Sequence, residues 1–405
     1  MRNNILLSVF LILFTVSMSF GKWNPAGLPI GTASLGMMFI IPIFIHVIVS
    51  GAWSNVLYYK WRSSLVVFFF AIFFTALIGG LKDGLNAEVY ELWYKLLGGI
   101  MTCMILHVLF KNNHYLHLSM LIYTVTMILI SIFYQIGVTF LPTDFRNGRL
   151  WLYGENPNST SGRFVVSIIF LLYFVFVNPY KWAGPRFLLL VSLFPMLYMI
   201  IASGSRGSLL ICAVSLILFF NNLRFRKKTV KFTILIIGLS AMAIYSIRLL
   251  NNSDFSMLER FNQTLEEGGD VRTALLNAAL NIFLQYPLLG CGISNFEKIM
   301  LYDYGFTNTV HNLYGYILAV SGLFGFMPFS IFLLSLVREA IKVIRTNMIS
   351  SVLLFFILAL AWKTGGIITY LFMWYVFSII ISFIEKGRNE NILKESHCIK
   401  GSSIN

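Results

Sequence analysis

The feature that most constrains this chain is a series of long apolar runs that recurs almost from end to end. A helix that crosses a bilayer needs about 20 predominantly apolar residues, because its backbone must satisfy its hydrogen bonds within the helix. The sequence therefore predicts an all-α, polytopic membrane protein with about 12 transmembrane helices. The twelve predicted spans are Ile5–Phe20, Leu35–Val49, Ser64–Ile78, Leu97–Phe110, Ser119–Phe140, Phe164–Val177, Phe187–Ile201, Leu209–Phe220, Phe232–Leu249, Leu313–Leu336, Val352–Trp362 and Ile367–Ile384.

The composition excludes a soluble globular protein. Hydrophobic residues make up 58% of the 405 residues and charged residues only 11%, whereas a soluble domain carries about 25% charged residues. We interpret residues 1–405 as a single integral membrane domain, in which the first apolar run is an uncleaved span rather than a removed signal peptide.

We attribute the net charge of +14 to basic residues that set the membrane topology, rather than to nucleic-acid binding. Basic residues gather on alternate loops of the twelve-span layout, and the positive-inside rule makes that side cytoplasmic, with both termini there. The segment "LRFRKKTVK", Leu223–Lys231, is interpreted as an anchor near anionic headgroups. The other basic loop residues include Lys60, Arg62, Lys111, Lys181, Arg186, Arg338, Lys342 and Arg345, and residues 385–405 form a cytoplasmic tail.

Two loops on the opposite side are longer than a simple connection requires. Residues 141–163 form one loop, and residues 251–310 form a large, partly helical loop, although most connections in helical proteins need fewer than about eight residues. Within the large loop, Arg272–Gly290 ("RTALLNAALNIFLQYPLLG") has apolar residues at helical spacing, which predicts an amphipathic helix that ends near Pro287 and Gly290.

Three basic residues on this extracytoplasmic side are the candidate functional residues. Arg206 stands in "ASGSRGSLL" between two short spans, near hydrocarbon, where an arginine costs about 2.5–3.5 kcal/mol at mid-bilayer. The small residues around it permit close approach to a ligand and expose backbone N–H groups to an anion. The alternative interpretation is an arginine that extends to the headgroups.

Arg272 begins the predicted loop helix, where a cation gains nothing from the helix dipole. Its position indicates an anion held by the side chain and the helix end together. The alternative is a solvated arginine paired with Glu266, Glu267 or Asp270. Arg260, earlier in the same loop, is the reserve candidate for this role.

His311 lies where the chain enters the next predicted span, and Asn312 follows it. A histidine has an ordinary pKa of about 6.5, which suits a general base near neutral pH. Asn312 is interpreted as an accessory residue that orients the ring or a substrate hydroxyl, and Glu155 as an extracytoplasmic carboxylate that binds sugar or assists His311. Taken without the two arginines, His311 could equally be interpreted as an amphipathic residue at the membrane–water interface.

Two permanent cations and one base suit a particular chemistry. Two arginines hold a diphosphate and stabilise the charge that develops as it leaves, and the base removes a proton from an attacking hydroxyl. The four cysteines (Cys103, Cys212, Cys291 and Cys398) have no paired spacing, and no metal-ligand cluster accompanies the three groups. We therefore expect group transfer from a lipid diphosphate to an alcohol, with no metal and no cofactor.

At these residues the sequence resembles the O-antigen polymerase and O-antigen ligase superfamily of bacterial inner membranes. The resemblance is carried by "GSRG" around Arg206, by Arg272 ahead of "YPLLGCGISNF", and by "HNLYGYILAVSGLFG" from His311. It implies a glycosyltransferase-C-like membrane fold, a role in lipopolysaccharide biosynthesis and an undecaprenyl-diphosphate-linked oligosaccharide donor. Arg206 and Arg272 would bind the diphosphate, and His311 would activate the acceptor hydroxyl on the periplasmic side.

The resemblance favours the polymerase, in which the acceptor is another lipid-linked repeat unit and a chain-length regulator protein is an expected partner. The O-antigen ligase, which transfers the glycan to lipid A-core, is the first alternative. A lipid-linked oligosaccharide flippase or transporter is an alternative from a different class, although such proteins usually show repeated halves and interrupted helices at mid-membrane. A structural membrane scaffold would leave Arg206 and the large loop unexplained.

Overall fold

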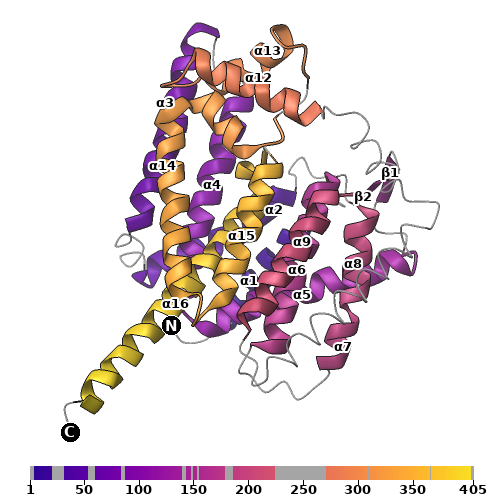
Figure 1. The fold of residues 1–405 in the computed structure, drawn as a ribbon, viewed down its shortest axis with the longest axis vertical. Coiled ribbons are helices and arrows are strands. Elements are labelled where there is room, and N and C mark those ends of the chain that lie inside the picture. Colours follow the sequence, from indigo (N-terminus) through magenta and orange to yellow (C-terminus); the bar gives the residue numbers. More distant parts are fainter. Residues whose placement is uncertain are drawn as a thin grey trace.

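The computed structural model is mostly helical (Figure 1). It describes residues 4–20, 32–52, 60–83, 87–138, 143–146, 149–152, 155–177, 186–223, 271–307, 310–364 and 366–402. Its helices are α1 (Ile5–Ser19), α2 (Thr32–Val49), α3 (Lys60–Asp83), α4 (Ala87–Leu109), α5 (Asn113–Gln135), α6 (Pro157–Phe176), α7 (Arg186–Val191), α8 (Leu193–Ala202), α9 (Arg206–Asn222), α12 (Val271–Gln285), α13 (Ile293–Tyr302), α14 (Leu313–Val343), α15 (Met348–Lys363), the 3-10 turn η2 (Gly366–Thr369) and α16 (Leu371–Ser402).

Within the described residues, five helices are long and apolar enough to cross a membrane: α3, α4, α5, α6 and α14. Further apolar helices there are shorter, namely α1, α2, α9, α15 and the segment Leu189–Ala202. The chain is therefore a membrane protein by length and composition of its helices. The expected count of about 12 spans is not confirmed, and the predicted span Phe232–Leu249 lies outside the described residues.

Helices α3 and α14 form the most extensive pair in the fold and run side by side (Figure 1). Aromatic pairs connect them in opposite sequence order, which makes the helices antiparallel. These pairs are Trp61 with Phe332 at 6.2 Å, Phe68 with Phe329 at 4.9 Å, and Phe74 with Phe324 at 6.0 Å between ring centroids. Offset and tilted aromatic pairs add stability beyond the area they bury.

The predicted span Leu313–Leu336 is not one uninterrupted helix, because α14 breaks at Gly322. The glycine has φ 57° and ψ −157°, a conformation that residues with a Cβ avoid. The loop Pro287–Gly292 lies against this break and supplies backbone partners there. Four N–H···O bonds join the two segments: Leu323 to Pro287 at 2.9 Å, Phe324 to Leu288 at 3.0 Å, Cys291 to Ala319 at 2.9 Å, and Gly292 to Val320 at 3.0 Å.

The predicted loop 141–163 needs correction at its end, where α6 already begins at Pro157. Asn156 accepts a hydrogen bond from the Asn158 N–H at 2.9 Å and caps the helix, and proline suits the first helical position. The earlier part of the loop contains a short antiparallel hairpin, β1 (Thr143–Arg146) with β2 (Arg149–Leu152). Sequence patterning missed the helix start because residues 157–163 are polar and small, yet they are buried.

The helix predicted within the large loop is confirmed as α12, which ends at Gln285, before Pro287. Its buried residues are Leu275, Ala278, Ala279 and Ile282, the face that the apolar spacing indicated. Figure 1 shows α12 and α13 at the upper end of the bundle, while the C-terminal end of α16 leaves the body at the lower left. Arg260 and the rest of residues 224–270 lie outside the described part of the chain.

Candidate functional site

Arg206 is the first residue of α9 and is half-buried. The chain enters this helix from α8 through Ser203, Gly204 and Ser205, and Gly204 adopts φ 61° in the turn. Ser205 occupies the N-cap position, but its side chain makes no capping hydrogen bond to the helix backbone. The first N–H groups of a helix have no partner within the helix, so this end of α9 concentrates positive charge beside the guanidinium group.

A buried network of small polar side chains holds the start of α9 against the start of α6. The Ser205 hydroxyl lies 2.9 Å from Asn158 Oδ1 and 2.8 Å from Ser208 Oγ. Ser161 donates to Ser208 Oγ at 2.7 Å. Because the hydroxyls are bonded to one another, the two helix starts are fixed side by side near Arg206.

Two further cations contact this network. Arg149 of β2 donates from Nε to the Ser203 carbonyl at 3.0 Å and from Nη2 to Asn158 Oδ1 at 3.1 Å. Lys363, the last residue of α15, donates from Nζ to Ser205 Oγ at 2.8 Å. The turn before α9 therefore contacts both an arginine of the hairpin and a lysine of α15.

His311 and Asn312 immediately precede α14. Asn312 is the N-cap of this helix, since its Oδ1 accepts a hydrogen bond from the Gly315 N–H at 2.9 Å, and its side chain is buried. His311 is half-buried beside it. Asn312 therefore caps the helix that begins directly after His311.

The first turn of α14 contacts α15 on one side. The Tyr314 hydroxyl donates to the Leu358 carbonyl at 3.3 Å, and the Tyr314 ring lies 6.1 Å from that of Trp362. Trp362 is followed by Lys363, which reaches the start of α9. The last turn of α15 thus connects the segment with His311 to the segment with Arg206.

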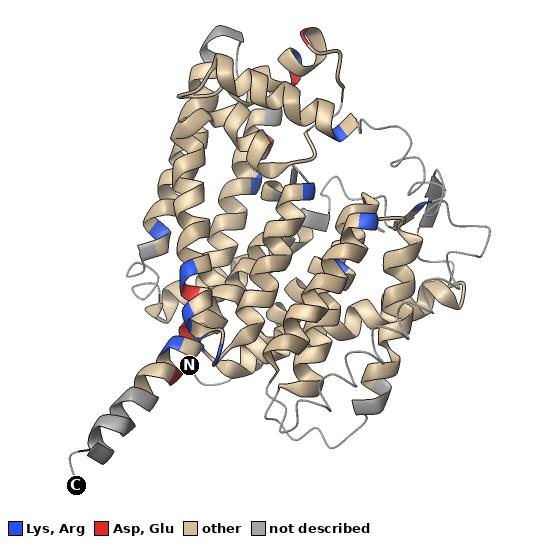
Figure 2. Cartoon of the chain, in the orientation of Figure 1, with Lys and Arg blue, Asp and Glu red and all other residues tan. Residues whose placement is uncertain are grey.

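The first turn of α14 contacts α12 on another side. A Cβ built on Gly315 would lie 2.6 Å from Leu276 Cδ1, so the two helices approach closely at this glycine. Arg272 is half-buried and lies one helical turn before Leu276. Figure 2 shows basic positions at the ends of α9, α12 and α15, which face the same end of the bundle. The segments with Arg206, Arg272 and His311 are therefore linked by direct contacts of neighbouring residues.

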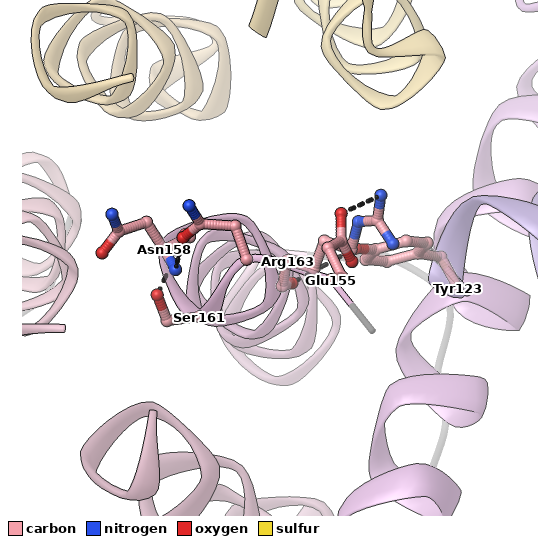
Figure 3. Close-up of polar contacts among 6 residues, drawn as sticks. Tyr123, Glu155, Asn158, Ser161 and Arg163 are labelled. Carbon is pink, nitrogen blue, oxygen red and sulfur yellow. Dashed lines mark hydrogen bonds and ion pairs between the residues drawn. The ribbon is translucent and has the colours of Figure 1, made fainter. Parts of the chain in front are cut away.

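Glu155 is held by an ion pair rather than by this network. Its Oε1 lies 2.9 Å from Nη2 of Arg163, and both side chains are buried. Figure 3 shows this pair on one side of the start of α6, near Tyr123, and Asn158 and Ser161 on the other side. The predicted accessory carboxylate therefore lies on a different face of α6 from the residues that contact α9.

Cys291 lies outside the predicted spans, and its thiol is buried. Burial raises the pKa of its thiol to about 12, so the reactive thiolate is scarce at neutral pH. Among the described residues, no group of three or more His, Cys, Asp and Glu side chains comes together in a way that could hold a metal ion.

Sequence reasoning missed Arg149, Asn158 and Lys363 as neighbours of Arg206. The positions of Arg149 and Lys363 could have indicated a functional role. In the twelve-span layout both residues fall on the side that the positive-inside rule leaves poor in basic residues. Asn158 carried none, since it was placed in a loop and its neighbours come from remote segments.

These features define a helical membrane protein with a cationic polar site at one end of its bundle. Residues 191–330 match the family model described as O-antigen ligase (Wzy_C). The predicted resemblance is confirmed over these residues, which are similar to the O-antigen ligase and polymerase superfamily. No curated protein matches the chain.

The matched region includes Arg206, Arg260, Arg272 and His311, whereas Arg149, Asn158 and Lys363 fall outside it. Members of this family are glycosyltransferase-like enzymes that act on lipid-linked glycans. The family match therefore supports the enzyme over the transporter and the scaffold.

Proposed function

We propose that the protein is an O-antigen polymerase of the bacterial inner membrane. It transfers a glycan from undecaprenyl diphosphate to the terminal sugar hydroxyl of a second lipid-linked repeat unit, without a metal ion and with inversion at the anomeric carbon. Arg206 and Arg272 bind the diphosphate of the donor, and His311 is the general base. Arg260 remains the reserve for the second arginine.

In this reaction His311 takes the proton of the acceptor hydroxyl as its oxygen bonds to the anomeric carbon of the donor. The bond from that carbon to the diphosphate oxygen breaks, and its electron pair leaves with undecaprenyl diphosphate. Attack from the face opposite the leaving group inverts the carbon. The arginines stabilise the negative charge that grows on the diphosphate, which is the usual role of fixed cations in such a transition state.

The observation that carries the proposal is the contact chain between the three candidate segments. Leu276 of α12 contacts Gly315 of α14, Tyr314 contacts the end of α15, and Lys363 of α15 contacts Ser205 beside Arg206. These segments are far apart in the sequence, and the family match covers all three candidate residues. A shared substrate accounts for the convergence of basic groups from separate helices.

The O-antigen ligase is the second candidate function, because the matching family model bears that description. The two enzymes share the donor and differ in the acceptor. We favour the polymerase because "SGSRG" and "HNLYGY" resemble the polymerase form of the motifs. In either case we propose that both termini are cytoplasmic, that residues 141–163 and 251–310 are periplasmic, and that the active site is periplasmic. A chain-length regulator is the proposed partner of the polymerase.

Complementation of two null strains tests the proposal. The chain is expressed in a strain that lacks its O-antigen polymerase and in one that lacks its O-antigen ligase, with matched repeat units. Restoration of long-chain O-antigen in the first strain alone supports the polymerase. Rescue of the ligase-null strain alone would transfer the assignment to the ligase, and failure in both strains with normal membrane expression would contradict both.

A further inference from the structure

We infer that Lys363 and Arg149 belong to the anion-binding site at the start of α9, where Lys363 binds a phosphate group of the lipid-linked donor. This inference rests on the proposed function and adds Lys363 to the diphosphate-binding residues, with Arg149 as a positioning residue beside it. The ligand chemistry is a phosphate ester or diphosphate, whose oxygens accept charge-assisted hydrogen bonds from ammonium and guanidinium groups.

Lys363 lies close to the backbone of α9 as well as to a serine. A Cβ built on Gly207 would lie 2.5 Å from Lys363 Nζ and 2.6 Å from Cδ and Cε. The glycine therefore leaves the space that the lysine side chain occupies beside the second residue of the helix. This contact lies next to the uncapped N–H groups of α9 and next to Arg206.

Electrostatics favours an anion there. The start of a helix is positive and disfavours a nearby cation, yet Lys363, Arg149 and Arg206 all lie around the start of α9. Lys363 gains some stabilisation as the last residue of α15, where a cation is favoured, but Arg149 and Arg206 have no such helix end. An anion at the start of α9 therefore gains from the helix N-terminus and from the cations that lie around it.

Arg149 contacts earlier residues of the same turn. It is within 3.0 Å, at Cγ, of a Cβ built on Gly204, and it fixes Ser203 and Asn158 through hydrogen bonds. Arg149 is therefore primarily a positioning residue, which holds the turn in the conformation that presents Arg206. Lys363 connects the turn to α15, whose neighbouring residues contact the first turn of α14 beside His311.

The test measures binding of inorganic pyrophosphate and of undecaprenyl phosphate to the purified full-length chain in detergent. Lys363→Met removes the charge and the hydrogen bond to Ser205, whereas Lys363→Gln keeps a donor for Ser205 without charge. We expect both variants to bind pyrophosphate at least about tenfold more weakly, the loss expected for one charge-assisted hydrogen bond. Lys342→Met, at an exposed lysine of α14 paired with Glu339, is the matched control and should bind as the unaltered chain does.

The two variants separate the binding role from a structural one. Normal affinity in Lys363→Gln with weak binding in Lys363→Met would overturn the inference, because the lysine would then serve only to hold Ser205. Normal affinity in both variants, with binding lost in Arg206→Ala, would also overturn it while leaving the proposed function intact. If the unaltered chain bound neither probe and Arg206→Ala kept full transferase activity, the proposed function itself would fail. If the two Lys363 variants bound undecaprenyl phosphate weakly but pyrophosphate normally, Lys363 would contact the phosphate nearest the lipid.

Discussion

Replacing Arg163 with methionine should strongly destabilise the protein, because it leaves the Glu155 carboxylate buried without its ion-pair partner. Nη2 of Arg163 lies 2.9 Å from Oε1 of Glu155, and the two side chains are 8% and 7% exposed. At an effective dielectric constant of about 20, unit charges at that separation attract by about 6 kcal/mol. Desolvation offsets much of this attraction, but breaking one side of a buried pair typically costs about 3–5 kcal/mol.

A double-mutant cycle measures the pair directly. Arg163→Met, Glu155→Gln and the double variant are compared by denaturant unfolding of the purified full-length chain in detergent, together with their transferase activity. We expect each single variant to be destabilised and the double variant to be more stable than the sum of the two losses predicts, with a coupling of about 1–3 kcal/mol. The exposed pair of Glu339 and Lys342 is the control, with an expected coupling below about 1 kcal/mol.

Additive losses of stability would contradict this prediction, because they would mean that the two groups do not interact in the folded protein. Activity provides a second criterion, because the buried pair with Arg163 assigns Glu155 to the stability of the α6 start. The double variant should therefore make product. A stable double variant without activity would instead support a direct role of Glu155 in binding sugar.

Three further predictions concern the backbone and the cations. Gly290→Ala places a Cβ 2.4 Å from backbone atoms of Ser321 and Val320. It should lower the unfolding midpoint far more than the control Gly305→Ala, because Gly305 has a similar φ but open space around it. Equal losses would show that the packing of this loop against α14 contributes little to stability. Gly207→Ala should displace the end of the Lys363 side chain and so weaken pyrophosphate binding several-fold. The unfolding midpoint should stay nearly unchanged, because only this flexible side chain must move. Unchanged affinity would contradict the proposed position of Lys363. Arg272→Ala should abolish product formation without loss of membrane expression. If Arg272→Ala were fully active and Arg260→Ala inactive, the second diphosphate contact would be assigned to Arg260.

Some of the fold followed from local patterns in the sequence. Apolar runs and the spacing of Leu275, Ala278 and Ile282 predicted membrane helices and α12, because both signals depend on neighbouring residues within one helix. The start of α6 was missed because Asn156 and Pro157 cap and begin a helix whose first turns are polar. Those turns are buried by contacts with remote segments, which no local pattern reveals.

The break in α14 was likewise beyond local reasoning. Gly322 lies within an apolar run that looks like one span, and its conformation depends on a loop about thirty residues earlier in the chain, which supplies the backbone partners of Leu323 and Phe324. Arg206 and His311 could be singled out as basic groups at the ends of apolar runs. The contact between Ser205 and Lys363, which connects their segments, joins residues 158 positions apart and required the three-dimensional arrangement.

The most direct test of the central claim is reconstitution of the purified chain with an undecaprenyl-diphosphate-linked repeat unit as both donor and acceptor. We expect longer lipid-linked glycans, with one undecaprenyl diphosphate released for each new linkage, and loss of this reaction in a folded His311→Ala variant. Full elongation by His311→Ala, or no elongation by the unaltered chain with an authentic repeat unit, would contradict the claim.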